Sequence, residues 1–244
     1  MTHPLRSAPR FALLAMSTAL MLMNAGCRSN EAAPQRESYV VAFLVSGPKV
    51  KEKTPEERQT VQAAHMANIG KLVDENKMVI AGPFGRPSPD ESMRGIFIFD
   101  TGDVARAREW TETDPAVQAG VLGMELSRIR TEARLRRALE LYRESLAKAG
   151  GMPGNDEMRG YAVVLAKSGE RARQAMGGLR DAGKVVFEGD LDDSPRGAYL
   201  AVLEASEADE AKTMLEPIAA GLGEHTVFPW WATVTLLELK PQGK

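Results

Sequence analysis

Hydrophobic and polar residues follow two different patterns along the chain, which predict short strands and amphipathic helices. Runs rich in β-branched and aromatic residues predict strands at 39–45, 78–81, 95–99 and 121–129. Apolar residues spaced by three or four positions predict helices at 55–73 and 103–111, and a short helical turn at 114–120. The predicted order of this region is therefore β-α-β-β-α-β.

The same order returns further along the chain. The strand-like segments 161–167, 183–189 and 195–200 repeat the character of 39–45, 76–82 and 93–98, and a helix at 207–222 and a strand at 231–239 complete the second set. The β-α-β-β-α-β order is typical of the ferredoxin-like fold, whose antiparallel sheet carries both helices on one face. We predict an α+β protein with two tandem ferredoxin-like units, in which each sheet covers the open face of the other.

A polar helical segment separates the two repeats. Residues 131–149 carry a stripe of Leu135, Leu139, Tyr142 and Leu146, and the Gly-rich stretch after it ends the helix. The predicted organisation comprises a signal peptide (1–27), a flexible tether (28–37), a first domain (38–130), a helical linker (131–157) and a degenerate second domain (158–240).

The N-terminal residues have the pattern of a bacterial export signal. Arg6 and Arg10 precede an apolar run at 11–23, which is shorter than the roughly 20 residues that a membrane-spanning helix needs. The segment 24–27 resembles a lipoprotein cleavage box, although Asn24 stands where an apolar residue is usual. We therefore expect lipidation of Cys27 and a membrane-anchored protein of the bacterial cell envelope, facing the periplasm or the exterior. The alternative is ordinary cleavage that leaves Cys27 as a free thiol.

Composition excludes several classes of function. The formal net charge is −2, and the arginines of 128–143 are interrupted by Glu132, Glu140 and Glu144, as on a solvated helix face, so nucleic-acid binding is not expected. Cys27 is the only cysteine, so no intramolecular disulfide is possible. The sequence contains no metal-ligand spacing, no Gly-rich phosphate loop and no serine-nucleophile elbow. We therefore predict neither a metal nor another cofactor.

Candidate chemistry is confined to the first repeat. His65 lies on the inward face of the first helix, Gly82 and Pro83 end the second strand, and Asp114 precedes Pro115. His65 as a general base needs a carboxylate to orient one ring nitrogen, and Asp114 is the candidate. Each residue also has a structural interpretation. His65 can be a hydrogen-bonded core residue and Asp114 a helix N-cap, and Gly82 and Pro83 can serve only to shape the end of a strand.

These residues also carry a family resemblance. His65, the strand end at 81–83, the strand beginning at Gly95, and Asp114-Pro115 followed by 119–120 together resemble the YCII-related family of dimeric α/β-barrel proteins, over residues 39–130. The resemblance implies that two ferredoxin-like units pack as a barrel, here a pseudo-dimer within one chain, with a pocket between sheet and helices. It also implies a catalytic dyad of His65 and Asp114.

The function expected from these residues is acid/base chemistry on a small molecule, of the isomerase, lyase or hydrolase type. His65 and Asp114 are the expected catalytic residues, and backbone N–H groups near Gly82 and Pro83 are expected to hold a substrate oxygen. The alternative is a non-catalytic envelope lipoprotein that binds a small ligand or has a structural role.

The second repeat has no counterpart of His65 or of Asp114-Pro115. Its segment 228–231, Phe-Pro-Trp-Trp, is expected near the position that 119–122 occupy in the first repeat, where it fills the vacated pocket, faces the sheet interface or belongs to the core. Arg94 and Arg196 recur just before a strand in both repeats, which favours a shared structural role.

Overall fold

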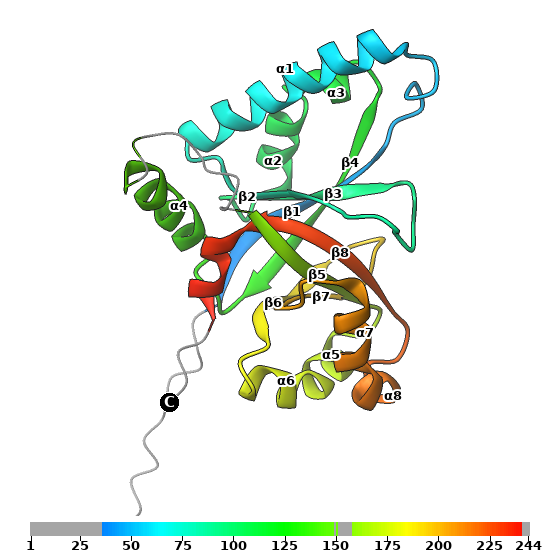
Figure 1. Cartoon of the computed structure of the whole chain (residues 1–244), viewed down its shortest axis with the longest axis vertical. Helices are drawn as coiled ribbons and strands as arrows, with labels where there is room; N and C mark the ends of the chain where they lie inside the picture. The colour runs from blue at the N-terminus through cyan, green and yellow to red at the C-terminus, as the bar shows by residue number, and fades with distance from the viewer. Residues whose placement is uncertain (1–35, 149, 151–157, 241–244) are drawn as a thin grey trace, which may run out of the picture. The chain divides into compact units, whose positions relative to one another are not determined.

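One antiparallel sheet of eight strands organises the protein. The computed structural model describes residues 36–148, 150 and 158–240. Within them the strands are arranged in the order β2-β3-β1-β4-β6-β7-β5-β8, and every neighbouring pair is antiparallel (Figure 1).

The N-terminal half (37–131) and the C-terminal half (158–233) have the same element order and the same strand order. The first contains β1 (Glu37–Ser46), α1 (Pro55–Asp74), β2 (Met78–Pro83), β3 (Met93–Phe99), α2 (Val104–Thr111), α3 (Pro115–Gln118) and β4 (Leu122–Thr131). The second contains β5 (Met158–Ala166), α5 (Gly169–Ala175), α6 (Gly177–Asp181), β6 (Val185–Asp192), β7 (Tyr199–Leu203), α7 (Ala208–Leu215), the 3₁₀ turn η2 (Glu216–Ile218), α8 (Ala219–Leu222) and β8 (His225–Thr233). Helix α4 (Arg136–Lys148) follows the first half, and the 3₁₀ helix η3 (Val234–Leu239) follows the second.

Two junctions join the halves into a closed barrel. At one, Arg128–Thr131 of β4 pair with Gly189–Asp192 of β6. At the other, the segment after β2 meets β8, where Phe84 forms a bridge with Trp230 and the backbone N–H of Gly85 donates to the carbonyl of Pro229 at 2.7 Å. The Arg196 guanidinium also spans the halves, because it binds both carboxylate oxygens of Glu125 at 2.6 and 2.8 Å.

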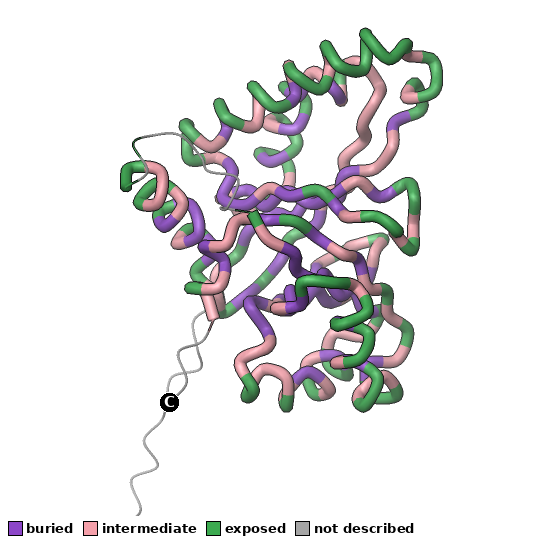
Figure 2. The backbone as a smooth tube through the Cα atoms, viewed as in Figure 1, coloured by how far each residue is buried: buried purple, intermediate pink, exposed green. Residues whose placement is uncertain are grey.

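Hydrophobic side chains form three layers. The barrel interior is one cluster with members from all eight strands, among them Phe43, Ile129, Tyr161 and Trp230. Outside the barrel, α1 and α2 cover one half through a second cluster, and α5, α7 and α8 cover the other half through a third. Figure 2 shows the buried backbone following the strands and the exposed backbone following the outer faces of the helices. The predicted α+β fold class, a pseudo-dimeric α/β barrel of ferredoxin-like units, is confirmed.

Local sequence signals explain where the site-bearing helices begin. Thr54 and Glu57 form a capping box at the start of α1, since each side chain bonds the backbone N–H of the other residue. Asp103 caps α2 by accepting from two backbone N–H groups. Asp114 caps α3 in the same way, ahead of Pro115.

The last strand was predicted in the wrong place. The expected strand at 231–239 is β8 at 225–233, and residues 234–239 form the 3₁₀ helix η3. The error came from Pro229, which argues against a strand interior, and from the β-branched residues 233–235. Pro229 is tolerated because β8 is the last strand of the ladder, where a missing N–H breaks no essential bond. Segment 228–231 therefore lies in mid-strand and does not occupy the position of 119–122.

Smaller boundaries also differ from the prediction. Arg36 binds Asp190 at 2.7 Å and Glu37 begins β1, so the last two residues of the predicted tether belong to the fold. Thr131 ends β4 before the linker helix starts at Arg136, and residues 151–157 of the linker lie outside the described residues. Arg94 lies inside β3, while Arg196 precedes β7 by a turn.

Three of the four tyrosines are buried, and this makes stability sensitive to high pH. Burial raises the pKa values of Tyr39, Tyr161 and Tyr199 above the usual range, and Glu37 and Glu188 raise those of Tyr39 and Tyr199 further. The unfolded chain loses these phenol protons near pH 10 while the folded chain keeps them, so the free energy of unfolding falls as pH rises above about 10.

We expect a loss of about 1.4 kcal/mol per pH unit for each of these tyrosines, measured by urea unfolding between pH 9 and 11. Tyr199→Phe should remove about a third of this slope. Ionisation of all four phenols near pH 10 in the folded protein, followed by absorbance at 295 nm, would contradict the prediction.

Candidate functional site

His65 lies on the inner face of α1, against the outer face of the barrel. Its side chain is 7% exposed, and its ring stacks on Phe97 of β3 with the centroids 5.8 Å apart and the planes inclined by 19°. Phe97 belongs to the hydrophobic cluster between α1, α2 and the sheet. The helix position and this ring contact together limit how the imidazole can turn.

Asp114 makes two hydrogen bonds at once. Its Oδ1 accepts from the backbone N–H of Ala116 at 2.8 Å, and its Oδ2 lies 2.7 Å from Nδ1 of His65. The carboxylate is 2% exposed, so these partners replace the water that it loses on burial. Because a carboxylate only accepts hydrogen bonds, Nδ1 carries a proton, and in the neutral ring Nε2 is the unprotonated, basic nitrogen.

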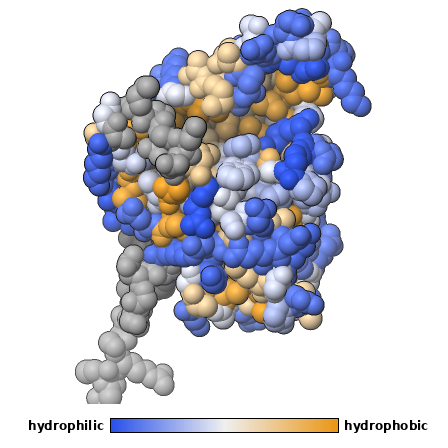
Figure 3. All heavy atoms as spheres, in the orientation of Figure 1, coloured by the Kyte–Doolittle hydropathy of each residue, from blue (hydrophilic) through white to orange (hydrophobic). Residues whose placement is uncertain are grey.

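Nε2 of His65 faces away from Asp114 and has no hydrogen-bond partner among the described residues. It is not one of the fully enclosed polar atoms that lack a partner. Half-buried Leu122 and Met124 of β4 pack on the same layer, and Figure 3 shows hydrophobic surface beneath the N-terminal part of α1. The geometry leaves Nε2 of the neutral ring as a basic nitrogen that the fold does not fully enclose.

A second contact ties α1 to the turn before Asp114. The hydroxyl of Thr113 lies 3.2 Å from Oδ1 of Asn68 and 2.7 Å from the carbonyl of Trp110. Asn68 follows His65 by one helical turn, so the two side chains share a face of α1. The amide nitrogen of Asn68 is buried and has no partner in the described part of the chain. The sequence patterns did not indicate Asn68 or Thr113, because a single Asn and a single Thr carry no spacing signal.

Gly82 and Pro83 occupy a different place from the His65–Asp114 pair. A Cβ at Gly82 would lie 2.2 Å from the carbonyl oxygen of Trp231 and 2.6 Å from the indole nitrogen of Trp230. Glycine is thus required by the close approach of β8. Pro83 is exposed, and no hydrogen bond or ring contact within the described residues connects it to His65. Substrate binding by these two residues stays a prediction.

The C-terminal half contributes no hydrogen bond or ring contact to His65 or Asp114 in the described part of the chain. In that half Ala172 takes the position equivalent to His65, because Ala172 precedes Lys184 by the same number of residues as His65 precedes Lys77. An acid-proline pair is nevertheless present as Glu216-Pro217 in η2, between the last helices and β8, which the sequence reading missed.

Other sequence predictions concern lipidation, metal binding and membrane spanning, apart from the His65–Asp114 pair. Cys27 lies outside the described residues. Among the residues that are described, no group of three or more His, Cys, Asp or Glu side chains is placed to hold a metal ion, and no helix has the length and apolar character to cross a membrane. A cavity of about 1210 Å³ lies at the junction of β4 with β6, and neither His65 nor Asp114 lines it.

Comparison with known proteins agrees with this fold. Residues 40–131 match the YCII-related domain family, so this part of the chain is a YCII-related domain. A search of curated proteins found no match. Among solved structures, a double mutant of chlorite dismutase from Candidatus Nitrospira defluvii has a TM-score of 0.52 at 11% identity, with 85% of this chain and 97% of that chain covered. A single mutant of the same protein gives 0.51 at 10% identity, with 84% and 95% covered. At this identity the likeness concerns the dimeric α/β-barrel fold alone.

Proposed function

We propose that this protein is an enzyme that performs acid/base chemistry on a small organic molecule, with His65 as the general base and Asp114 as its orienting partner. The observation that carries the proposal is the 2.7 Å contact between Nδ1 and Oδ2, together with an Nε2 that has no partner among the described residues. A merely structural role accounts for the bond of Nδ1 to Asp114 but gives Nε2 no function in the described part of the chain. The YCII-related domain that contains both residues supports the same interpretation.

In the proposed mechanism Nε2 takes a proton from the substrate or from a water molecule, and the ring becomes an imidazolium. The Asp114 carboxylate stabilises that charge through Nδ1–H. The imidazolium then returns the proton to another substrate atom in an isomerisation, or to a leaving group in an elimination or hydrolysis. The apolar surroundings of Leu122 and Met124 favour a compact substrate that is mainly hydrocarbon around its reacting centre.

We also propose that the protein acts at the bacterial cell envelope, held to a membrane by a lipid on Cys27. This part of the proposal is supported by the sequence of residues 1–27, with its two arginines, its short apolar run and its single cysteine.

The test is turnover of a panel of small esters, lactones, hydroxy acids and keto acids by the protein and by His65→Ala. We expect His65→Ala to lower kcat/KM for any active compound by about 10²–10⁴-fold, the usual contribution of a general base. His225→Ala is the matched control, since His225 lies in β8 and binds the Gly223 carbonyl. Equal turnover by the protein and His65→Ala would contradict the proposal. Binding of a compound that depends on His65, without turnover, would instead support the non-catalytic alternative.

A further inference from the structure

The junction between β4 and β6 contains a cavity of about 1210 Å³ to which both halves contribute. The two strands pair only between Arg128–Thr131 and Gly189–Asp192, because the chain leaves the sheet after Thr131 and turns into α4. Residues Val185–Glu188 of β6 therefore have no β4 partner, and they form one wall. Ligand sites of comparable size often lie at such interfaces between domains.

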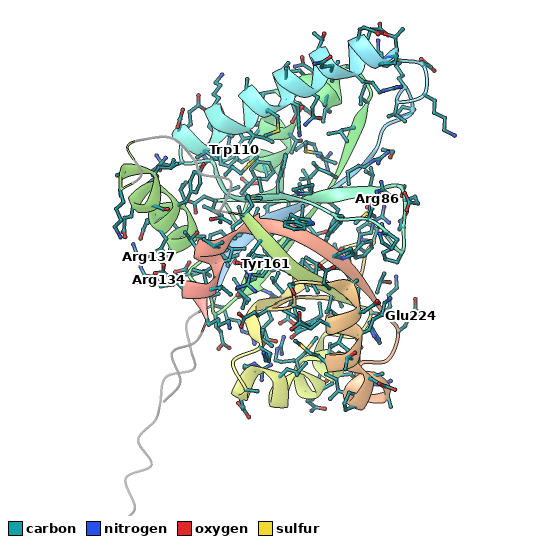
Figure 4. All side chains as sticks on the ribbon, viewed as in Figure 1. Arg86, Trp110, Arg134, Arg137, Tyr161 and Glu224 are labelled. Atoms are coloured by element: carbon teal, nitrogen blue, oxygen red, sulfur yellow. The ribbon has the colours of Figure 1, made fainter. Side chains whose placement is uncertain are left out.

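Arginine is the commonest residue in the lining of the cavity. Its lining includes seven arginines and no lysine, at positions 36, 130, 134, 136, 137, 173 and 180. Six carboxylate residues also line it, so its formal charge is +1, whereas the whole chain carries −2. Figure 4 shows Arg134 and Arg137 projecting near the start of α4. Guanidinium groups, being planar and always charged, suit carboxylate, sulfonate and phosphate oxygens better than ammonium groups do.

The hydrogen bonds among these side chains leave the guanidinium groups with spare donors. Arg173 binds Asp190, Arg180 binds Glu188, and Arg137 bonds Glu140 and Glu144 at 3.0 and 2.9 Å. Across the described residues, each of the seven arginines uses one or two of its three nitrogens in hydrogen bonds or longer ion pairs. Four of the six lining carboxylates, Glu37, Asp100, Glu140 and Glu188, are hydrogen-bonded to a tyrosine or an arginine, so most of the acceptors are engaged while N–H donors remain.

The wall also has an apolar part. Half-buried Ala133 and Leu239 line the cavity beside the arginines, whereas the side chains of Val185, Val186 and Phe187 at the β6 wall are buried in the hydrophobic clusters. Behind this wall, the buried hydroxyl of Tyr199 bonds Glu188, which holds Arg180 in turn, so the polar rim is anchored to the core of the C-terminal half. A ligand that fits both surfaces has an apolar body and an anionic head.

We propose that this junction cavity is a second binding site, for a small organic anion with a hydrophobic body, such as an aromatic or aliphatic carboxylate, sulfonate or phosphate monoester. The site shares no residue with the His65–Asp114 pair, so a test of binding at this site does not depend on whether the proposed catalysis is correct. It requires both halves, because α4 and β4 supply one wall and β6, α5 and α6 supply the other.

The probe is 8-anilinonaphthalene-1-sulfonate, which joins an aromatic body to a sulfonate. We expect one molecule to bind per chain with enhanced fluorescence. Arg137→Ala and Arg173→Ala, one from each wall, should each weaken binding about tenfold, as expected for the loss of a charge-assisted hydrogen bond. Both side chains are more than a third exposed, and Asp190 keeps Arg36 as a partner when Arg173 is removed, so both variants should fold.

Arg106→Ala is the matched control, because Arg106 is an exposed arginine of α2 outside the cavity lining. It should bind the probe as the unchanged protein does, and so should His65→Ala. Urea unfolding of each variant verifies that the fold is intact. Equal affinity of Arg137→Ala, Arg173→Ala and Arg106→Ala would overturn the proposal, as would the absence of saturable binding. Arg173→Lys should recover only part of the affinity, since it restores the charge without the planar fork.

Discussion

Replacing Trp230 with alanine is expected to remove about 3–5 kcal/mol from the free energy of unfolding, the usual cost of truncating a buried tryptophan. Trp230 is fully buried in the barrel interior, packs 6.0 Å from the Tyr161 ring and forms the bridge to Phe84 that closes the barrel. Since small proteins are stable by only about 5–15 kcal/mol, this single change should remove a large share of the total.

The matched control is Trp231→Ala. Trp231 is the next residue of the same strand, but its side chain points to the opposite face and is 47% exposed. Its loss should cost about 1 kcal/mol or less. The measurement is urea unfolding followed by tyrosine fluorescence and by far-ultraviolet circular dichroism. Similar costs for the two tryptophans would show that the indole of Trp230 does not close the barrel.

The same experiment tests whether the halves unfold together. Because the interior cluster receives side chains from all eight strands, neither half can keep the barrel interior packed when the other half unfolds. We therefore expect a single transition, with both probes coincident, in the protein and in Trp230→Ala. Two separated transitions would mean that each half carries a core of its own.

The order of the elements was accessible from the sequence because local signals determine it. The helix predicted to begin at Pro55 does so, and Asp114 ahead of Pro115 caps a helix as expected. The contact between His65 and Asp114 could also be anticipated, since the fold brings the first helix and the turn before the fourth strand to the same edge. Its hydrogen-bond geometry follows from the carboxylate serving as cap and ring partner simultaneously.

Features that depend on packing between the halves were not accessible. The sequence of β8 contains a proline in mid-strand, and only its position at the end of the ladder makes that proline acceptable. The requirement for a glycine at position 82 comes from the close approach of the Trp231 carbonyl, which no local pattern in the sequence indicates. The junction cavity arises because β4 ends at Thr131 while β6 begins at Val185, four residues before their pairing starts, and no local pattern encodes that offset.

Changing Asp114 to asparagine is the second substitution with a large expected effect, this time on the chemistry of His65. The asparagine oxygen can still accept from the backbone N–H of Ala116, so the cap of α3 should survive with a small change in stability. The amide NH₂ then faces Nδ1 of His65, where the carboxylate oxygen was. An NH₂ group only donates, so Nδ1 must become the acceptor and the ring proton must move to Nε2.

This exchange of tautomers removes the proposed base without removing the imidazole. We expect kcat/KM for any substrate of the protein to fall by about 10³–10⁴-fold, because the corresponding change in the Ser-His-Asp triad lowers turnover about 10⁴-fold through the wrong tautomer. Asp114→Ala should show the same loss of activity and also destabilise the protein by about 0.5–2 kcal/mol, since it removes the cap as well.

The tautomer itself can be measured without a substrate, from the ¹⁵N chemical shifts of the histidine rings in two-dimensional NMR. In the unchanged protein the neutral His65 ring should carry its proton on Nδ1, and in Asp114→Asn on Nε2. The ring of His225 serves as an internal reference, because its Nδ1 lies 2.7 Å from the Gly223 carbonyl and makes no contact with Asp114. If the His65 ring keeps its proton on Nδ1 after the substitution, Asp114 does not set the tautomer. Its role would then be that of a helix cap, and the case for a catalytic pair would fail.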